Sequence, residues 1–128
     1  MWRNCPSRTA DALPNGRQAL GGYGESLAAR WYLDRGYEVV DRNWRAAGGE
    51  IDLILRQGRV LVFCEVKTRA SDRYGSPAEA VTAVKQRRIR RVAAAYLQGR
   101  HGPGRPDVLR FDVACVTGRD VEVIEQAF

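Results

Sequence analysis

Residues 49–69, GEIDLILRQGRVLVFCEVKTR, contain two apolar runs on either side of a glycine. Runs of this length around a glycine predict two antiparallel strands joined by a tight turn, which we place at Gln57-Gly58. This turn would set Arg56 opposite Arg59, and residues opposite one another lie on the same face of a sheet. One face is then apolar throughout and is expected to be core: Ile51, Leu53, Leu55, Val60, Val62 and Cys64.

The other face of the hairpin is apolar in its middle and charged at its open end. The predicted register sets Glu50 against Glu65 and Asp52 against Phe63, with Lys67 two residues beyond Glu65. Carboxylates that face one another repel. A frayed strand end in water, where repulsion is weak, is one interpretation. A hard-cation site is the other, because Mg²⁺ takes oxygen ligands, and the apolar neighbours of Asp52 favour it.

The elements on either side of the hairpin complete a mixed fold. A helix is predicted over 17–35 and ends at Gly36, and strands are predicted over 37–45, 107–118 and 120–126. Ser76, Pro77 and Glu79 predict the start of a second helix, which runs to about residue 97. The order α-β-β-β-α-β-β indicates an α/β (mixed α+β) fold. Residues 1–16 are expected to be a flexible tail and 17–128 a single domain.

The second predicted helix carries an unusual lysine. Its apolar face contains Val81, Val84, Ile89, Val92, Ala95 and Tyr96, and Lys85 falls inside that face. A lysine on a buried face needs an acidic partner or a phosphate, which the acidic end of the hairpin or its ligand would supply. A lysine that extends to water at the margin of the helix is the alternative. Only Lys67 and Lys85 are lysines among the 21 basic residues.

Composition excludes several classes of site. Three scattered cysteines and one histidine give neither a zinc-ligand pattern nor a Ser-His-Asp triad. No apolar run reaches the ~20 residues of a membrane span, and no signal-peptide pattern occurs at the N-terminus, so a cytoplasmic protein is expected. The net charge of +6 equals the charge of residues 81–100, which favours a polyanion partner, although a solvated helix face is equally consistent. Asp112 is expected to pair with Arg110 or another arginine.

Five segments together resemble a known family: GESLAARWYLDRGYEVVDRNWR, GEIDLI, FCEVKTR, GSPAEAVTAVKQRRI and RFDVA. They resemble the YraN-like family of small bacterial proteins, which is similar to the PD-(D/E)XK nucleases of the Holliday-junction-resolvase-like branch. The likeness covers residues 21–116. It implies a restriction-endonuclease-like, three-layer core, in which a central mixed sheet is flanked by helices. The proline that precedes the first aspartate in that superfamily is replaced here by Ile51.

The resemblance also implies roles for individual residues. Asp52 and Glu65 would bind Mg²⁺ or Mn²⁺, and Glu25 would join the metal shell. Lys67 would be the catalytic lysine of the Glu65-Val66-Lys67 motif, and Glu50 is a further candidate catalytic residue. The Val66 carbonyl is a further candidate ligand. The expected nucleic-acid-binding residues are Lys85, Arg87, Arg88, Arg91, Arg69 and Thr68.

The sequence therefore predicts a metal-dependent nuclease that acts on branched, flapped or single-stranded DNA. A nucleic-acid-binding adaptor that keeps the nuclease fold without turnover is the alternative. A protein-interaction module that uses residues 85–91 is a third possibility. We expect DNA as the partner and no membrane association.

Overall fold

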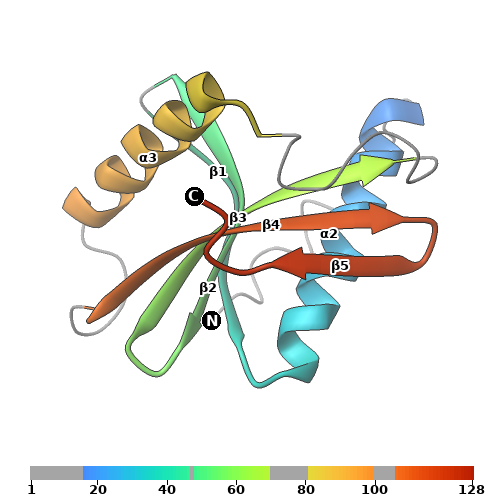
Figure 1. Ribbon diagram of the computed structural model, residues 1–128, viewed down its shortest axis with the longest axis horizontal. Coiled ribbons are helices and arrows are strands. Elements are labelled where there is room, and N and C mark those ends of the chain that lie inside the picture. The colour runs from blue at the N-terminus through green and yellow to red at the C-terminus, as the bar shows by residue number, and fades with distance from the viewer. Residues whose placement is uncertain (1–15, 47, 70–80, 100–105) are drawn as a thin grey trace.

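The computed structural model describes residues 16–46, 48–69, 81–99 and 106–128, and it describes side chains from residue 22 onward. The predicted N-terminal tail lies almost wholly outside these residues. The elements, shown in Figure 1, are α2 (Gly16–Asp34), β1 (Glu38–Ala46), β2 (Gly49–Gln57), β3 (Val60–Arg69), α3 (Ala83–Gln98), β4 (Val108–Thr117) and β5 (Asp120–Ile124). This order confirms the predicted α-β-β-β-α-β-β sequence of elements. Within the described part of the chain, no helix is long and apolar enough to cross a membrane.

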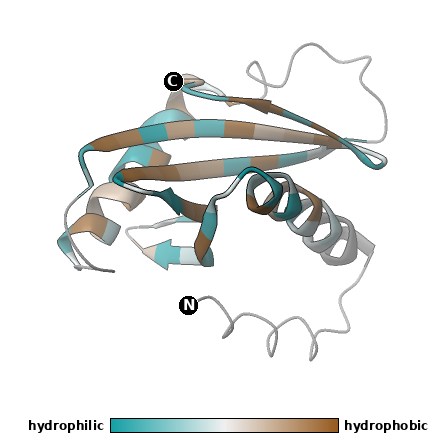
Figure 2. Cartoon of the chain, turned by 90° about the horizontal axis from the view of Figure 1, so that it is seen from below, coloured by the Kyte–Doolittle hydropathy of each residue, from teal (hydrophilic) through white to brown (hydrophobic). Residues whose placement is uncertain are grey.

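The five strands form one mixed sheet in the order β1-β2-β3-β4-β5. Neighbouring strands are antiparallel except β3 and β4. These two run parallel because the connection that contains α3 returns the chain to the end of the sheet at which β3 begins. Figure 2 shows hydrophobic residues interspersed with hydrophilic ones along the strands, and apolar side chains of β2 and β3 pack on both faces of the sheet. The mixed α+β class is confirmed.

Two apolar clusters lie on opposite faces of the sheet and hold one helix each. Ala28, Ala29 and Tyr32 of α2 pack with Leu53 and Val62. The helix α3 packs its buried residues Ile89, Val92, Ala93 and Tyr96 against the other face, which includes Ile54, Leu61 and Phe63. Because neighbouring residues of β2 and β3 enter different clusters, the sheet lies between the two helices. This is the three-layer arrangement that the family resemblance implied.

A buried carboxylate ties α2 to β4. Asp112 is fully buried, and it accepts hydrogen bonds from the Tyr32 hydroxyl at 2.6 Å and from two nitrogens of Arg110 at 2.9 Å. The backbone N–H of Gln126 also donates to it, at 3.1 Å. Four donors satisfy a charge that would otherwise be costly to bury. The predicted pairing of Asp112 with Arg110 is confirmed.

The hairpin register differs by two residues from the predicted one. Gln57 pairs with Val60 and Ile54 with Phe63, so the two turn residues are Gly58 and Arg59. Gly58 has a φ of 60°, whereas Arg59 is not among the residues with positive φ. A two-residue turn with glycine at its first central position is typical of the type II′ turn, whereas the prediction set glycine second. A shift of two residues keeps each side chain on its predicted face, but the facing partners of Glu50 and Asp52 were predicted wrongly.

Ile51 was assigned to the wrong face. It packs with Phe63 and Ile54 on the α3 side, together with its pairing partner Trp44. Two irregularities interrupt the simple alternation here. The pairing of β2 with β3 ends at Leu53, and Asn43 on β1 has a φ of 52°, a left-handed conformation that asparagine tolerates better than most residues.

The helix α3 begins later than predicted. Thr82 is its N-cap, and the Thr82 hydroxyl accepts a hydrogen bond from the backbone N–H of Lys85 at 3.2 Å. Ser76, Pro77 and Glu79, the predicted cap residues, lie outside the described residues. Val84 is 56% exposed, so its predicted place on the apolar face is wrong. Val84 precedes Ile89 by five residues, which places it about 140° around the helix and outside the buried face of α3.

Candidate active site

Asp52 lies where β2 separates from β3. The last paired residues of the two strands are Leu53 and Cys64. Beyond them, the Asp52 carboxylate accepts a hydrogen bond from the backbone N–H of Val66 at 2.8 Å. A side chain thus takes the place of a backbone acceptor, which fixes the Asp52 carboxylate beside the strand that carries Glu65 and Lys67. The opening between the strands leaves room for that carboxylate.

Four carboxylates gather around this point from three elements. Glu65 is buried on β3, Glu50 and Asp52 come from β2, and Glu25 comes from α2. Burial, followed by the negative charge of Glu65, raises the pKa of Asp52 to about 8, and the charges of Glu25 and Glu50 act in the same direction. The Val66 N–H acts in the opposite direction without offsetting them. The predicted convergence of acidic groups is therefore present in the structure.

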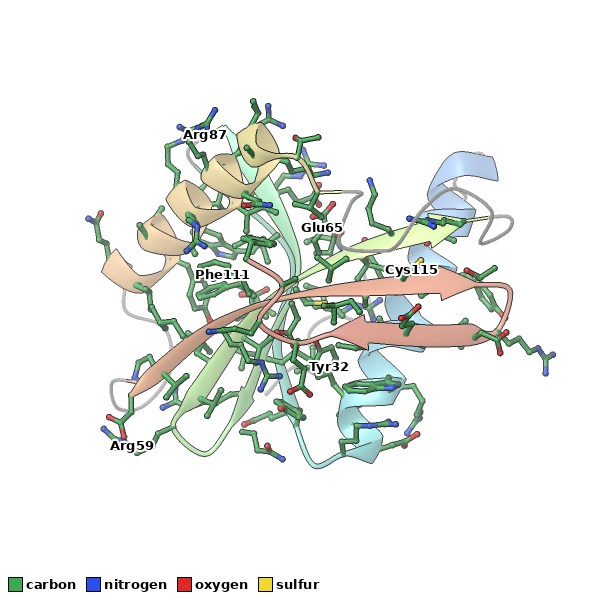
Figure 3. All side chains as sticks on the ribbon, in the orientation of Figure 1. Tyr32, Arg59, Glu65, Arg87, Phe111 and Cys115 are labelled. Carbon is green, nitrogen blue, oxygen red and sulfur yellow. The ribbon has the colours of Figure 1, made fainter. Side chains whose placement is uncertain are left out.

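Lys85 contacts this cluster directly. Its ammonium Nζ lies 2.7 Å from Glu65 Oε2, and the Glu65 side chain is only 7% exposed. Figure 3 shows Glu65 on β3 below α3, the helix that carries Lys85. The acidic partner predicted for Lys85 is thus Glu65. The interaction is a partly buried ion pair, because 36% of the Lys85 side chain remains exposed.

A hollow of about 550 Å³ opens beside Asp52 and Glu65. Its lining includes three acidic and three basic side chains: Glu50, Asp52, Glu65, Arg45, Lys85 and Arg88. Gly48, in the turn before β2, and Gly49, the first residue of β2, form another part of the lining. A Cβ on Gly49 would come within 2.8 Å of Val92 Cγ2 and 2.9 Å of Arg88 Cγ, so glycine lets β2 approach α3 closely here.

The other predicted site residues lie in different surroundings. Lys67 is half-buried on β3, two residues beyond Glu65, and is not part of the lining of the hollow. Thr68 packs toward α2, because a Cβ on Gly24 would overlap with its Oγ1. Arg69 is the last residue of β3. The structure therefore does not bring Thr68 together with the basic residues of α3.

The arginines of α3 divide into two groups. Arg87, Arg88 and Arg91 are exposed, and Figure 3 shows Arg87 on the outer side of the helix, away from the sheet. Arg90 is exposed as well, but its guanidinium lies over aromatic rings, with Cζ 4.8 Å from the centroid of Phe111. A cation at this distance from a ring face contributes to packing. Three of the four arginines are thus available to an external anion.

The chemistry of the acidic cluster fits a divalent cation. Carboxylate oxygens are the ligands that Mg²⁺ and Mn²⁺ prefer, and a cation would relieve the repulsion that raises the pKa of Asp52. Among the described residues, however, no three acidic, histidine or cysteine side chains already stand in a metal-binding arrangement. Glu65 is engaged by Lys85, which stands where a cation would bind. The donors fit, and their use requires the Lys85 ion pair to open.

Two residues beside this site were missed by the sequence reasoning. Asn43 donates from Nδ2 to Glu25 Oε1 at 3.0 Å, and Arg45 lines the hollow and lies 3.7 Å from Glu50 Oε1. An asparagine inside a predicted strand is a usable signal, because asparagine is depleted in strands and tolerates positive φ. Arg45 gave no such signal, since an arginine at a strand end is ordinary.

Comparison with known proteins finds a family across most of the described chain. The model of the family described as "Uncharacterised protein family UPF0102" matches residues 24–116. A UPF0102 protein of Nocardioides sp. is 55% identical over 92 residues, which cover 72% of this chain and 74% of that protein. One of Rhodococcus jostii is 55% identical over 100 residues, covering 77% and 81%. One of Anaeromyxobacter dehalogenans is 48% identical over 108 residues, covering 84% and 79%.

Proposed function

We propose that this chain, which belongs to the uncharacterised UPF0102 (YraN) family, is a metal-dependent nuclease that hydrolyses phosphodiester bonds in branched, flapped or single-stranded DNA. The observation that carries the proposal is the gathering of Glu25, Glu50, Asp52 and Glu65 beside a hollow that also holds basic side chains. Acidic and basic groups in one hollow are what a cation and a phosphate need together. The proposed location is the cytoplasm, where bacterial DNA lies.

Asp52 and Glu65 are the proposed ligands of Mg²⁺ or Mn²⁺, and Glu25 is a further member of the shell. Asp52 is held by the Val66 N–H and Glu25 by the Asn43 amide, so both carboxylates are oriented before any ligand arrives. When bound, such a cation would lower the pKa of a coordinated water and polarise the phosphate. Glu50 lies next to Asp52 at the rim, where it adds negative charge.

Lys67 is the proposed catalytic cation. It follows Glu65 by two residues on β3, so its backbone position is fixed relative to the acidic cluster. An ammonium there would orient the attacking water and stabilise the negative charge that develops on the phosphate. Hydrolysis then needs no nucleophilic side chain, which agrees with a site built of carboxylates and cations.

The DNA backbone is proposed to lie along α3. Arg87, Arg88 and Arg91 are exposed there, and Arg88 with Lys85 also lines the hollow. Contacts between basic side chains and phosphates give affinity that depends on salt and carries little sequence information. We therefore propose recognition of DNA structure or ends. Thr68 and Arg69 are weaker candidates for these contacts, since Thr68 packs toward α2.

One observation favours the alternative of a nucleic-acid-binding adaptor without turnover. Glu65 is ion-paired to Lys85, and no ready-made set of three ligands occurs among the described residues. In an adaptor, this ion pair would be permanent and structural. The adaptor and the nuclease differ in one property, which is whether the acidic cluster takes up a divalent cation and supports cleavage.

Cleavage of labelled DNA tests the two functions. Flapped, branched, single-stranded and duplex DNA would be incubated with wild-type protein in Mg²⁺, Mn²⁺ or EDTA. If the protein is a nuclease, DNA is cleaved only with a divalent cation, and cleavage is lost in Asp52→Ala and Lys67→Ala. Cleavage is retained in Glu122→Gln, which alters an exposed residue of β5. Intact DNA under all conditions, with salt-dependent binding unchanged by Asp52→Ala, would support the adaptor. Equal cleavage by wild type and Asp52→Ala would place the activity outside this site.

A further inference from the structure

The ion pair between Lys85 and Glu65 occupies a group that the proposed function assigns to a metal. Lys85 Nζ lies 2.7 Å from Glu65 Oε2. Lys85 is the cation that pairs with Glu65, whose side chain is 7% exposed and belongs to a cluster with the acids Asp52, Glu25 and Glu50. The Lys85 ammonium is therefore a cation that the chain supplies to its own acidic cluster.

We propose that Lys85 is an internal competitor of the divalent cation, and that uptake of the cation releases Lys85 to bind a substrate phosphate. This inference rests on the proposed function and deepens it, since it couples metal binding to DNA binding at one site. Metal and DNA would then bind with positive cooperativity.

The two cations cannot share Glu65 without strong repulsion. A metal within about 2.1 Å of Glu65 Oε2 would lie within roughly 5 Å of the ammonium at its present position. Like charges at this separation repel strongly where burial keeps water out. Lys85 can move away, because 36% of its side chain is exposed and it borders the hollow. Its backbone stays in place, since its N–H donates to the Thr82 hydroxyl.

The surroundings of Lys85 favour a phosphate once Glu65 is taken. Lys85 lies in the first turn of α3, where the helix dipole disfavours a cation, and that turn contains no acidic residue. In the metal-free protein, the negative charge of Glu65 offsets this unfavourable position of the Lys85 ammonium. Once Glu65 binds a metal instead, an external anion would offset it. Arg88 lies about one turn further along the helix and lines the same hollow. The released lysine thus acts together with Arg88 on the DNA backbone.

Arg88 provides a matched control. It lines the same hollow and comes from the same helix as Lys85, but within the described residues it has no ion pair or hydrogen bond. Lys85→Met and Arg88→Met each remove one positive charge and keep a long apolar side chain. A general effect of charge on metal affinity would appear in both variants, whereas competition for Glu65 would appear only in Lys85→Met.

Mn²⁺ titrations of the three proteins, followed by the electron paramagnetic resonance of free Mn²⁺, test the competition. We expect Lys85→Met to bind Mn²⁺ about tenfold more tightly than wild type, and Arg88→Met to remain within about twofold of wild type. Equal tightening in both variants, or no tightening in Lys85→Met, would overturn the inference and leave the proposed function standing. Failure of all three proteins to bind Mn²⁺ would overturn both.

DNA binding provides a second readout that does not require cleavage. In a Lys67→Met background, a labelled single-stranded oligonucleotide would be titrated in EDTA and in Mn²⁺ by fluorescence anisotropy. Mn²⁺ should raise the DNA affinity about tenfold when Lys85 is present and much less in Lys85→Met. Arg88→Met should weaken binding in both buffers and keep the gain from Mn²⁺. A gain from Mn²⁺ of the same size with and without Lys85 would refute the coupling.

Discussion

Replacing Asp52 by asparagine should stabilise the metal-free protein, and increasingly so as the pH rises. Asp52 has its pKa raised from the ordinary 3.8 to about 8, mainly by burial and by the charge of Glu65. A carboxyl with a raised pKa in the folded state makes folding less favourable as it ionises. The free energy of unfolding of the wild type should therefore fall between about pH 4 and pH 8, whereas the amide of the Asp52→Asn variant does not ionise.

The size of the effect follows from the same pKa. Each pKa unit corresponds to about 1.4 kcal/mol, so the rise from 3.8 to about 8 sets a ceiling of about 6 kcal/mol. The Asp52 side chain is not fully buried, and its carboxylate accepts the Val66 N–H, so a gain of about 1–3 kcal/mol is expected. For a domain of this length, that gain corresponds to a melting temperature higher by roughly 3 to 15 °C.

Thermal melting by circular dichroism in EDTA, from pH 5 to pH 9, measures this difference. The gap between Asp52→Asn and wild type should widen up to about pH 8 and then level off. Glu122 is an exposed carboxylate on β5, so Glu122→Gln serves as the control, and its melting temperature should follow that of the wild type at every pH. A gap that stays constant with pH, or a variant less stable than wild type at pH 8, would refute the account of Asp52 as an ionised carboxylate held at a cost.

Three further substitutions test the packing around the site by thermal or urea denaturation. Gly24→Ala should lower the free energy of unfolding by about 1–3 kcal/mol, because the new Cβ would overlap with Thr68 Oγ1. Adding Thr68→Ala should recover most of that loss, whereas a loss of helix contacts alone would not be recovered. Asn43→Ala should cost about 1–2 kcal/mol more than Asn43→Gly, because the φ of 52° strains alanine, and equal costs would argue against that strain. Arg110→Met should cost about 3–5 kcal/mol, because it leaves the fully buried Asp112 without its cation, and a change below about 1 kcal/mol would contradict this role.

The order of elements and, apart from Ile51, the two faces of the hairpin followed from the sequence because they depend on local periodicity. Alternating apolar residues fixed which side of the sheet Leu53, Leu55 and Val62 would join. The partner of each residue was predicted wrongly, because the turn type decides it and glycine can serve at either position of a two-residue turn. A shift of two residues preserves the faces, so the acidic residues were still brought to one place.

The parts that the sequence did not reveal depend on contacts between distant residues. Asn43 has a positive φ, and its side chain forms a hydrogen bond to Glu25, which lies 18 positions away in the sequence. The start of α3 at Ala83 was missed, because Ser76, Pro77 and Glu79 form a good capping pattern and Thr82 a plainer one. Lys85 was found because a lysine inside an apolar stripe requires a partner, although its specific partner, Glu65, came from the structure.

Direct measurement of Mn²⁺ binding tests the central claim, which is that Asp52 and Glu65 hold a divalent cation. Electron paramagnetic resonance of free Mn²⁺ at pH 8 would be recorded against wild type, Asp52→Asn and Glu122→Gln. We expect one saturable site in wild type and in Glu122→Gln, and an affinity at least about tenfold weaker in Asp52→Asn. Binding of equal strength in Asp52→Asn, or no saturable binding by the wild type, would contradict it.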